Sequence, residues 1–320
     1  EQTICWTLKL EVDEQVSLSV IGALTSTATV SDPLHEAERL SIFAMFEGAK
    51  RLMARHAEAW AELWESDIEI EGDLQAQRDI RFALHNLYAY VRAGSRRSIP
   101  PMGLSSQGYN GHIFWDAELW MVPPLLALQP ELAKSCLDYR TDRLPAARRK
   151  AQAYGFEGAM YPWESAGTGE ECTPVWALTG TSEHHITACV GIALWNYYRV
   201  TGDQTWLRTQ GYPVLAEIAD FWVSRTEEGP SGDCDIKNVV GADEYTGVVD
   251  NNAFTNGAAI TVLRYATQAA RALGLAPDPE WAVVADCIPI LTFEDGTTQE
   301  YERFEEETVK QADANLLTYP

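Results

Sequence analysis

The part of this chain best equipped for chemistry is a short segment in which aromatic and carboxylate side chains alternate. Trp163 and Glu164 are adjacent in the run Tyr161–Gly167, and Pro162 lacks the backbone donor that the interior of a helix requires. The segment is therefore predicted to be a loop that presents an indole face and a carboxylate together. Such a pair can bind a sugar, because the apolar ring face stacks on the indole and the hydroxyls bond to the carboxylate. The alternative is a surface loop that its aromatic residues hold in place.

A second run of this kind, Gly111–Met121, leads from a glycine-rich loop into a predicted helix. Trp115 and Asp116 stand at that junction and are candidate sugar-binding residues. The alternative for Asp116 is structural, since a carboxylate in the first turn of a helix caps the chain or complements the helix dipole. Trp120 and Met121 are expected to pack in the core.

A third run, Gly241–Tyr245, places two adjacent carboxylates beside an aromatic ring. Partial desolvation by Tyr245 would raise the pKa of a neighbouring carboxyl group, as a general acid that works near neutral pH requires. More polar residues follow in Asp250–Asn256. The alternative is a turn followed by a helix cap, with Asn252 or Asp250 as the capping residue. It accounts for one or two of these residues but not for the whole set.

Two further candidates are weaker when taken alone. Lys310 and Gln311 can bond several hydroxyl groups, but the start of a solvated helix has the same composition. His184 and His185 have no third ligand at a suitable spacing, so we expect a buried histidine bonded to its neighbours rather than a metal site.

The six cysteines contain no Cys-x-x-Cys pair and are expected to be single buried thiols rather than a disulfide framework. Neither a metal nor a cofactor is predicted.

The elements that must position these loops are mostly helices. Apolar residues alternate from Trp6 to Val20, which predicts strands, but a lone hairpin is marginal in water and would need further strands preceding residue 1. From residue 33 onward the apolar spacing is helical, with Asp32 as the first cap. Long loops separate the helices, which suits a barrel of paired helices whose loops build a cleft. After the first helix, the predicted helices cover residues 73–92, 115–127, 131–154, 182–200, 205–226, 253–274 and 278–290.

The strongly acidic composition argues against nucleic acid and anionic membranes as partners. Among 320 residues, 47 acidic against 24 basic side chains give a formal net charge of -23. A field of that sign repels nucleic acid and anionic membranes, so neither is an expected partner. No apolar run is long enough to cross a bilayer. The charge is no obstacle to a neutral sugar.

Taken together in their order, these stretches resemble glycoside hydrolase family 65, the inverting α-glucoside hydrolases and phosphorylases. The resemblance covers roughly residues 60–320, and several strings in one order are far more specific than any one of them. It implies a mainly α-helical fold with an (α/α)6 barrel as catalytic domain, in residues 73–320 and incomplete here. The end of an N-terminal β-sandwich in residues 1–30 and a helical linker in residues 31–72 would precede it. The strings are GYNGHIFWDAELWM, YPWESAGTGEE, EHHI, GADEY, VDNNAFTN and KQAD.

The resemblance also implies roles for these residues. Glu244 would be the general acid that protonates the glycosidic oxygen. The Phe-Trp-Asp string would hold the terminal glucose, the Lys-Gln pair would close around it, and the Trp-Glu pair would face the leaving sugar. The family usually has Pro where this chain has Ala242, which changes the stiffness of the loop rather than the acid. The residues that would bind substrate are Trp115, Asp116, Trp163, Glu164, Lys310 and Gln311.

An inverting mechanism also needs a second group, for which the chain offers no candidate. Opposite the acid stands either a bound phosphate or a carboxylate that activates water, with the two carboxyl groups about 6.5–9.5 Å apart. The resemblance places that general base, or the phosphate-binding loop, beyond Pro320. The chain is therefore expected to be part of a longer protein.

The remaining choice is between hydrolysis and phosphorolysis. Trp120–Pro124 and Ser98–Gly103 are similar to the branch that includes kojibiose hydrolases, and the negative charge disfavours a phosphate substrate. The prediction is an inverting, exo-acting α-glucoside hydrolase that releases β-glucose from a disaccharide or glucosylated acceptor, with an α-1,2 linkage as in kojibiose. The alternatives are a maltose, trehalose or kojibiose phosphorylase, an inactive sugar-binding relative, or a helical scaffold. The compartment (periplasm or cytoplasm) and the oligomeric state, with a homodimer as one alternative, stay open.

Overall fold

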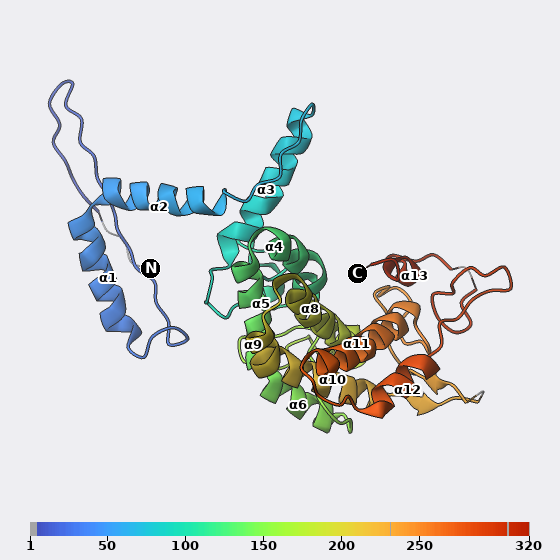
Figure 1. Ribbon diagram of the computed structural model, residues 1–320. Coiled ribbons are helices and arrows are strands. Elements are labelled where there is room, and N and C mark those ends of the chain that lie inside the picture. Colours follow the sequence, from blue (N-terminus) through green and yellow to red (C-terminus); the bar gives the residue numbers. More distant parts are fainter. Residues whose placement is uncertain (1–4, 231, 306, 320) are drawn as a thin grey trace. The chain divides into compact units, whose positions relative to one another are not determined.

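The computed structural model describes residues 5–230, 232–305 and 307–319 of the chain. The chain divides into two units, Glu1–Ser66 and Asp67–Pro320. The second unit is built mainly from α-helices, as predicted, and the described part of the first unit contains two helices (Figure 1). None of the helices in the described ranges combines the length and the apolar character that a bilayer crossing requires.

The first unit contains no strand among its described residues. The turn predicted at Asp13 and Glu14 forms, and the N–H of Glu14 donates to the carbonyl oxygen of Glu11 over 3.1 Å. The strands predicted on either side of it do not form, since residues 5–30 make no β-ladder. Two strands without a third cannot bury an apolar face, and Trp6 is accordingly 54% exposed. Alternation of apolar residues alone was not enough to predict a sheet.

The helices predicted after residue 32 are present in the same unit. α1 (Pro33–Glu47) begins with Asp32 as its cap, whose carboxylate accepts the N–H of His35, and a proline occupies the first helical position. Gly48 ends α1 with a φ of 78°, a conformation that glycine adopts without strain. α2 (Ala49–Leu63) follows directly.

The second unit begins with the amphipathic helix predicted between residues 73 and 92. α3 (Leu74–Tyr90) starts at Asp73, whose carboxylate accepts two backbone N–H groups of the first turn. Leu84 and Tyr88, which belong to the predicted apolar stripe, are buried. The local pattern therefore predicted both the start and the buried face of this helix.

The longer helices that follow are α4 (Val122–Leu128), α5 (Pro130–Asp142), α6 (Leu144–Ala153), α8 (His185–Thr201), α10 (Tyr212–Arg225), α11 (Ala253–Ala272) and α12 (Pro279–Cys287). α8 packs against α4, α5, α10 and α11, and α11 also contacts α10 and α12 (Figure 1). Gly191 allows α8 and α11 to approach closely, because a Cβ atom there would lie 2.2 Å from Cγ2 of Val262. These two helices are buried along most of their length and form the core.

One long helix predicted over residues 131–154 is instead the pair α5 and α6, which meet at Arg143. Pro145 has no N–H to donate to a carbonyl one turn earlier, so a continuous helix would lose that hydrogen bond. Shorter elements lie between the long helices: η1 (Gly108–Gly111), η2 (Ala117–Met121), α7 (Thr179–Ser182), α9 (Gln204–Trp206), η3 (Leu207–Gly211) and α13 (Asp313–Leu316).

A short hairpin and a disulfide bond tie one long loop to α12. β1 (Glu227–Glu228) and β2 (Cys234–Asp235) pair antiparallel. Cys234 is bonded to Cys287, so the prediction of single thiols is wrong for these two residues. Spacing in sequence could not reveal the pair, because tertiary packing brings together residues 53 positions apart. Cys136 and Cys189 are buried free thiols, as predicted. Cys5 and Cys172 are also free but exposed.

Candidate active site

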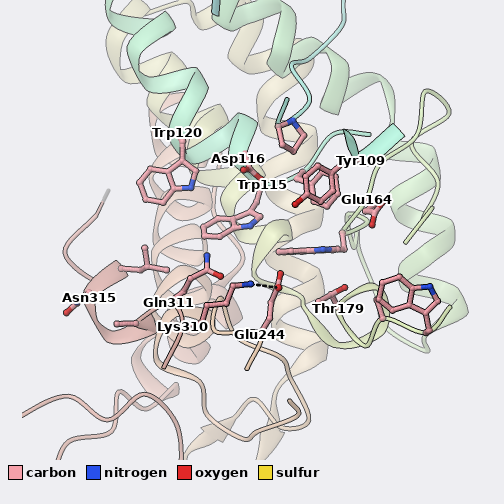
Figure 2. A pocket seen from close by; sticks show the side chains of 17 residues that line it. Tyr109, Trp115, Asp116, Trp120, Glu164, Thr179, Glu244, Lys310, Gln311 and Asn315 are labelled. Carbon is pink, nitrogen blue, oxygen red and sulfur yellow. Dashed lines mark hydrogen bonds and ion pairs between the residues drawn. The ribbon is translucent and has the colours of Figure 1, made fainter. Parts of the chain in front are cut away.

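Loops of the second unit enclose a pocket of about 750 Å³ (Figure 2). A volume of this size is typical of sites that bury a small organic ligand. The lining comes from the η2 region, the loop before α7, the loop after β2 and the segment before α13, which are far apart in the sequence. Every residue to which the sequence assigned a site role lines this pocket: Trp115, Asp116, Trp163, Glu164, Glu244, Lys310 and Gln311.

Two indoles form a buried wall of the pocket. Trp115 and Trp163 are 7% and 5% exposed, and their ring centroids lie 6.4 Å apart. The imidazole of His185 packs edge-on against both, with centroid distances of 4.7 Å and 5.6 Å. Because they are packed from behind, the indoles are already oriented to receive the apolar face of a sugar ring.

Asp116 stands at the start of η2, but its side chain makes no capping hydrogen bond. The capping alternative is therefore wrong, and the carboxylate instead lines the pocket beside Trp115 (Figure 2). Burial raises the pKa of Asp116, and the charges of Glu118 and Glu244 raise it further. A poorly hydrated carboxylate of this kind is a good acceptor for ligand hydroxyl groups.

The adjacent residues Trp163 and Glu164 lie in a loop, as Pro162 predicted. The carboxylate of Glu171 accepts the N–H groups of Trp163 over 2.9 Å and of Glu164 over 3.1 Å. At the other end of its side chain, Glu164 Oε2 lies 2.9 Å from Nδ1 of His112. Both the backbone and the carboxylate of Glu164 are thus held in place.

Glu244 and Lys310 meet inside the pocket. Oε2 of Glu244 lies 3.1 Å from Nζ of Lys310 (dashed line in Figure 2), and the two side chains are 39% and 44% exposed. The hydrogen bond from this ammonium and the charge of the carboxylate raise the pKa of Lys310. The expected desolvation by Tyr245 is not found, because Tyr245 is 70% exposed and does not line the pocket. The predicted acid is therefore a partly hydrated, ion-paired carboxylate.

Trp120 was predicted to pack in the core, but the structure places it elsewhere. It is 44% exposed, lines the pocket and stacks on Tyr319 with a centroid distance of 5.3 Å. Met121 is only partly buried. Trp120 in η2 and Trp115, two residues before η2, thus face the same pocket, with ring centroids 6.0 Å apart.

The two adjacent histidines are buried and bonded to their neighbours, as predicted. Nε2 of His185 lies 2.8 Å from Oε1 of Glu183. His184 lies 2.8 Å from the carbonyl oxygen of Thr181, and Arg225 donates to its other ring nitrogen over 3.1 Å. Burial lowers the pKa of both histidines to about 3, so the imidazoles are neutral. Within the described residues, no group of three or more His, Cys, Asp or Glu is placed to hold a metal ion.

Two large aromatic residues of the pocket were missed by the sequence analysis. Trp176 and Tyr109 line the pocket and are 82% and 57% exposed. Trp176 follows Pro174 in the long loop that also carries Trp163, and this placement was the available signal. Tyr109 stands in the glycine-rich loop with a φ of 55°, and its place in the string GYNGHIFWDAELWM was the available signal.

Comparison with known proteins agrees with the resemblance seen in the sequence. The model of the glycosyl hydrolase family 65 central catalytic domain matches residues 81–287. Kojibiose hydrolases from Flavobacterium johnsoniae and Mucilaginibacter mallensis are each 52% identical to this chain over 98% of its length. A kojibiose phosphorylase from Thermoanaerobacter brockii is 43% identical over 66% of the chain. The chain spans 46% of the length of each hydrolase and 29% of that phosphorylase.

A solved structure shares the fold. The "Putative kojibiose phosphorylase from human microbiome" superposes with a TM-score of 0.75 over 85% of this chain and 40% of its own length, at 21% sequence identity. The paired helices of the second unit are accordingly those of an (α/α)6 barrel domain. The chain belongs to glycoside hydrolase family 65.

Proposed function

We propose that this chain carries the acid side of the active site of an inverting, exo-acting α-glucoside hydrolase. The substrate is a disaccharide or glucosylated acceptor with an α-1,2 linkage, as in kojibiose, and the product is β-glucose. The observation that carries the proposal is the convergence of Glu244 and Lys310 with the indoles of Trp115 and Trp163 in one pocket. The two kojibiose hydrolases at 52% identity support both the reaction and the linkage.

In this proposal the terminal glucose stacks on Trp115 and is bonded by Asp116, Lys310 and Gln311. Binding draws the Lys310 ammonium from Glu244 toward the sugar hydroxyls and excludes water, and both changes favour the protonated form of a carboxyl group. Glu244 then donates its proton to the glycosidic oxygen as the bond to the leaving sugar breaks.

The leaving sugar faces Trp163 and Glu164 on the other side of the broken bond. Water attacks the anomeric carbon from the face opposite Glu244 and gives its proton to a second carboxylate, so that the released glucose has inverted configuration. No described residue is assigned the role of that base.

An inverting phosphorylase of the same family is the alternative, and kojibiose phosphorylases are among the relatives. A bound phosphate needs cationic or strong hydrogen-bond donors beside it. Among the described residues that line the pocket, Lys310 is the only cation, and it is already paired with Glu244. This part of the site therefore favours water as the nucleophile.

The test is incubation of the full-length protein with kojibiose, trehalose, maltose and nigerose, each with and without inorganic phosphate. Anomeric proton signals in NMR spectra identify the first product formed. Release of β-glucose without phosphate supports hydrolysis. Formation of β-glucose 1-phosphate, seen only when phosphate is present, overturns it.

A non-catalytic sugar-binding protein is separated from an enzyme by one substitution. Glu244→Gln removes the proton donor and should abolish turnover of kojibiose while leaving its binding intact. Glu131→Gln, on the exposed side of α5, is the matched control and should behave like the wild type. If the wild type also binds kojibiose without turning it over, with or without phosphate, the sugar-binding alternative holds.

A further inference from the structure

Glu244 and Lys310 lie in two different segments of the chain. Each segment carries a buried carboxylate that accepts backbone N–H groups of the other. Asp243 directly precedes Glu244. Its Oδ1 accepts the N–H of Lys310 over 2.9 Å and the N–H of Gln311 over 3.4 Å. The carboxylate of the first loop thus bonds the backbone of the second.

Asp313 makes the reverse connection. It follows Gln311 by two residues, and its Oδ1 accepts the N–H of Ala242 over 2.8 Å while its Oδ2 accepts the N–H of Asp243 over 3.1 Å. Two backbone N–H groups from each loop therefore end on a carboxylate of the other loop. We call this arrangement of Asp243, Asp313 and their bonded N–H groups the double-carboxylate clamp.

The clamp is buried and closely packed. Asp243 is 3% exposed and Asp313 is 1% exposed, and neither lines the pocket. Gly241 passes so near that a Cβ atom there would lie 2.2 Å from Nδ2 of Asn252 and 2.8 Å from Oδ1 of Asp313. Burial of a carboxylate is costly unless its oxygens are bonded, and the four N–H groups supply those bonds. Contact with solvent or substrate does not explain why these two acids are present.

We propose that Asp243 and Asp313 are positioning residues, whose clamp sets the distance and direction between the Glu244 carboxyl group and the Lys310 ammonium while the glycosidic bond breaks. The inference rests on the proposed function of Glu244. The ion pair itself is partly exposed, and such pairs contribute too little to stability to hold two loops in register. The buried clamp holds the backbone from which both side chains extend.

The expected consequence of losing the clamp is a misplaced acid. A general acid must come within hydrogen-bond reach of the glycosidic oxygen, and a displacement of about 1 Å can lower the rate about 100-fold. The loss should lower kcat because the acid is misplaced, and it should also raise KM because Lys310 and Gln311 bond the sugar. The indole wall of Trp115 and Trp163 is built on other elements and should stay in place.

Protonation of the clamp should have the same effect. Burial raises the pKa of Asp313, and the hydrogen bonds from the N–H groups of Ala242 and Asp243 lower it. Burial is the larger effect, and the resulting pKa is about 6. An added proton turns an acceptor into a donor, so one of these N–H groups loses its partner. Three other titratable groups interact with Asp313, namely Asp243, Glu183 and Glu300. Glu183 in turn interacts with Glu244 and Lys310.

The experiment compares two substrates in the full-length protein. Kojibiose needs a proton on its leaving oxygen, whereas α-glucosyl fluoride releases fluoride with little help from an acid. The variants are Asp313→Asn and Asp243→Asn, each of which keeps the shape of the side chain. Glu244→Gln is the reference for loss of the acid. Asp203→Asn is the matched control, because Asp203 also accepts a backbone N–H, that of Trp206, but lies outside the pocket.

We expect both clamp variants to lower kcat for kojibiose about 100-fold and to leave kcat for the fluoride nearly unchanged, as Glu244→Gln does. The clamp variants could instead lose activity equally on both substrates while Glu244→Gln loses it only on kojibiose. That result would overturn the positioning role of Asp243 and Asp313 and leave the acid role of Glu244 intact. Equal losses on both substrates in Glu244→Gln would instead remove the acid role itself, and the clamp with it. Thermal unfolding is measured for each variant, and if one of the two does not fold, the other still breaks the clamp from the opposite loop.

Discussion

The ammonium of Lys310 lies 3.1 Å from the carboxylate of Glu244, although the two residues are 66 positions apart in the sequence. Both side chains are more than one third exposed, so the attraction adds at most about 1 kcal/mol to the stability of the fold. The pair is better explained by ligand binding, since an exposed cation beside an acid is free to turn toward sugar hydroxyls.

Substitution of Lys310 should therefore impair the reaction without weakening the protein. Lys310→Met removes a charged donor to the substrate, and such bonds contribute about 1.5–3 kcal/mol, which corresponds to a rise in KM of about 10- to 100-fold. The melting temperature should stay close to that of the wild type. Lys134→Met on α5, which also loses an ion pair with a carboxylate, is the control. Identical kinetics for the two variants would contradict a role for Lys310 in binding.

Glu183 should make stability depend on pH. Its Oε1 bonds to His185, while its Oε2 is buried and has no hydrogen-bond partner among the described residues. Burial first, and then the charges of Glu244 and Asp313, raise the pKa of Glu183 well above its usual value. A raised pKa in the folded state means a contribution to stability that is present below the unfolded pKa and is lost as pH rises through the folded value.

Glu183→Gln cannot lose a proton and should lack this dependence. The melting temperatures of wild type and variant should be similar in acid, and the variant should become the more stable of the two as the pH rises. Calorimetry across the acid-to-alkaline range measures the difference, with the exposed Glu131→Gln as control. Parallel curves for Glu183→Gln and wild type would show that the buried carboxyl group does not titrate in this way.

Trp176 should affect substrate binding but not folding. Its side chain is 82% exposed and lines the pocket, so truncation removes a stacking surface and almost no core contact. Stacking on an aromatic ring contributes about 0.5–1.5 kcal/mol, so Trp176→Ala should raise KM about 2- to 10-fold with kcat and melting temperature little changed. Phe82→Ala removes an aromatic ring of similar exposure (71%) from α3, outside the pocket. An unchanged KM in Trp176→Ala would exclude the contact.

The bond between Cys234 and Cys287 should stabilise the second unit. It closes a loop across 53 residues, and the lower chain entropy of the unfolded state corresponds to about 2–4 kcal/mol. Replacing both cysteines by serine should lower the free energy of unfolding in urea by about that amount. Dithiothreitol should lower the stability of the wild type toward that of the double variant and leave the variant unchanged. A wild type that is insensitive to the reductant would show that the bond is absent in solution.

Several local features could be predicted because a few neighbouring residues decide them. Asp32 and Asp73 cap their helices with their own side chains, and Asn252 does the same for α11. Pro162 cannot stand in the interior of a helix, so its segment could be assigned to a loop. Pro145 carried the same signal for the break between α5 and α6, although the prediction ran one helix through it.

By itself, the sequence determined where most helical segments lie, seven of the residues that line the site and, through the order of its motifs, the family. These properties depend on neighbouring residues or on similarity, and neither requires knowledge of contacts. Only the tertiary structure decided that Trp120 faces the pocket, that Cys234 meets Cys287 and that Asp243 and Asp313 hold each other's loops. Each of these is a contact across a long stretch of chain, and it arises when helix packing closes that stretch, an event that no local pattern of residues encodes.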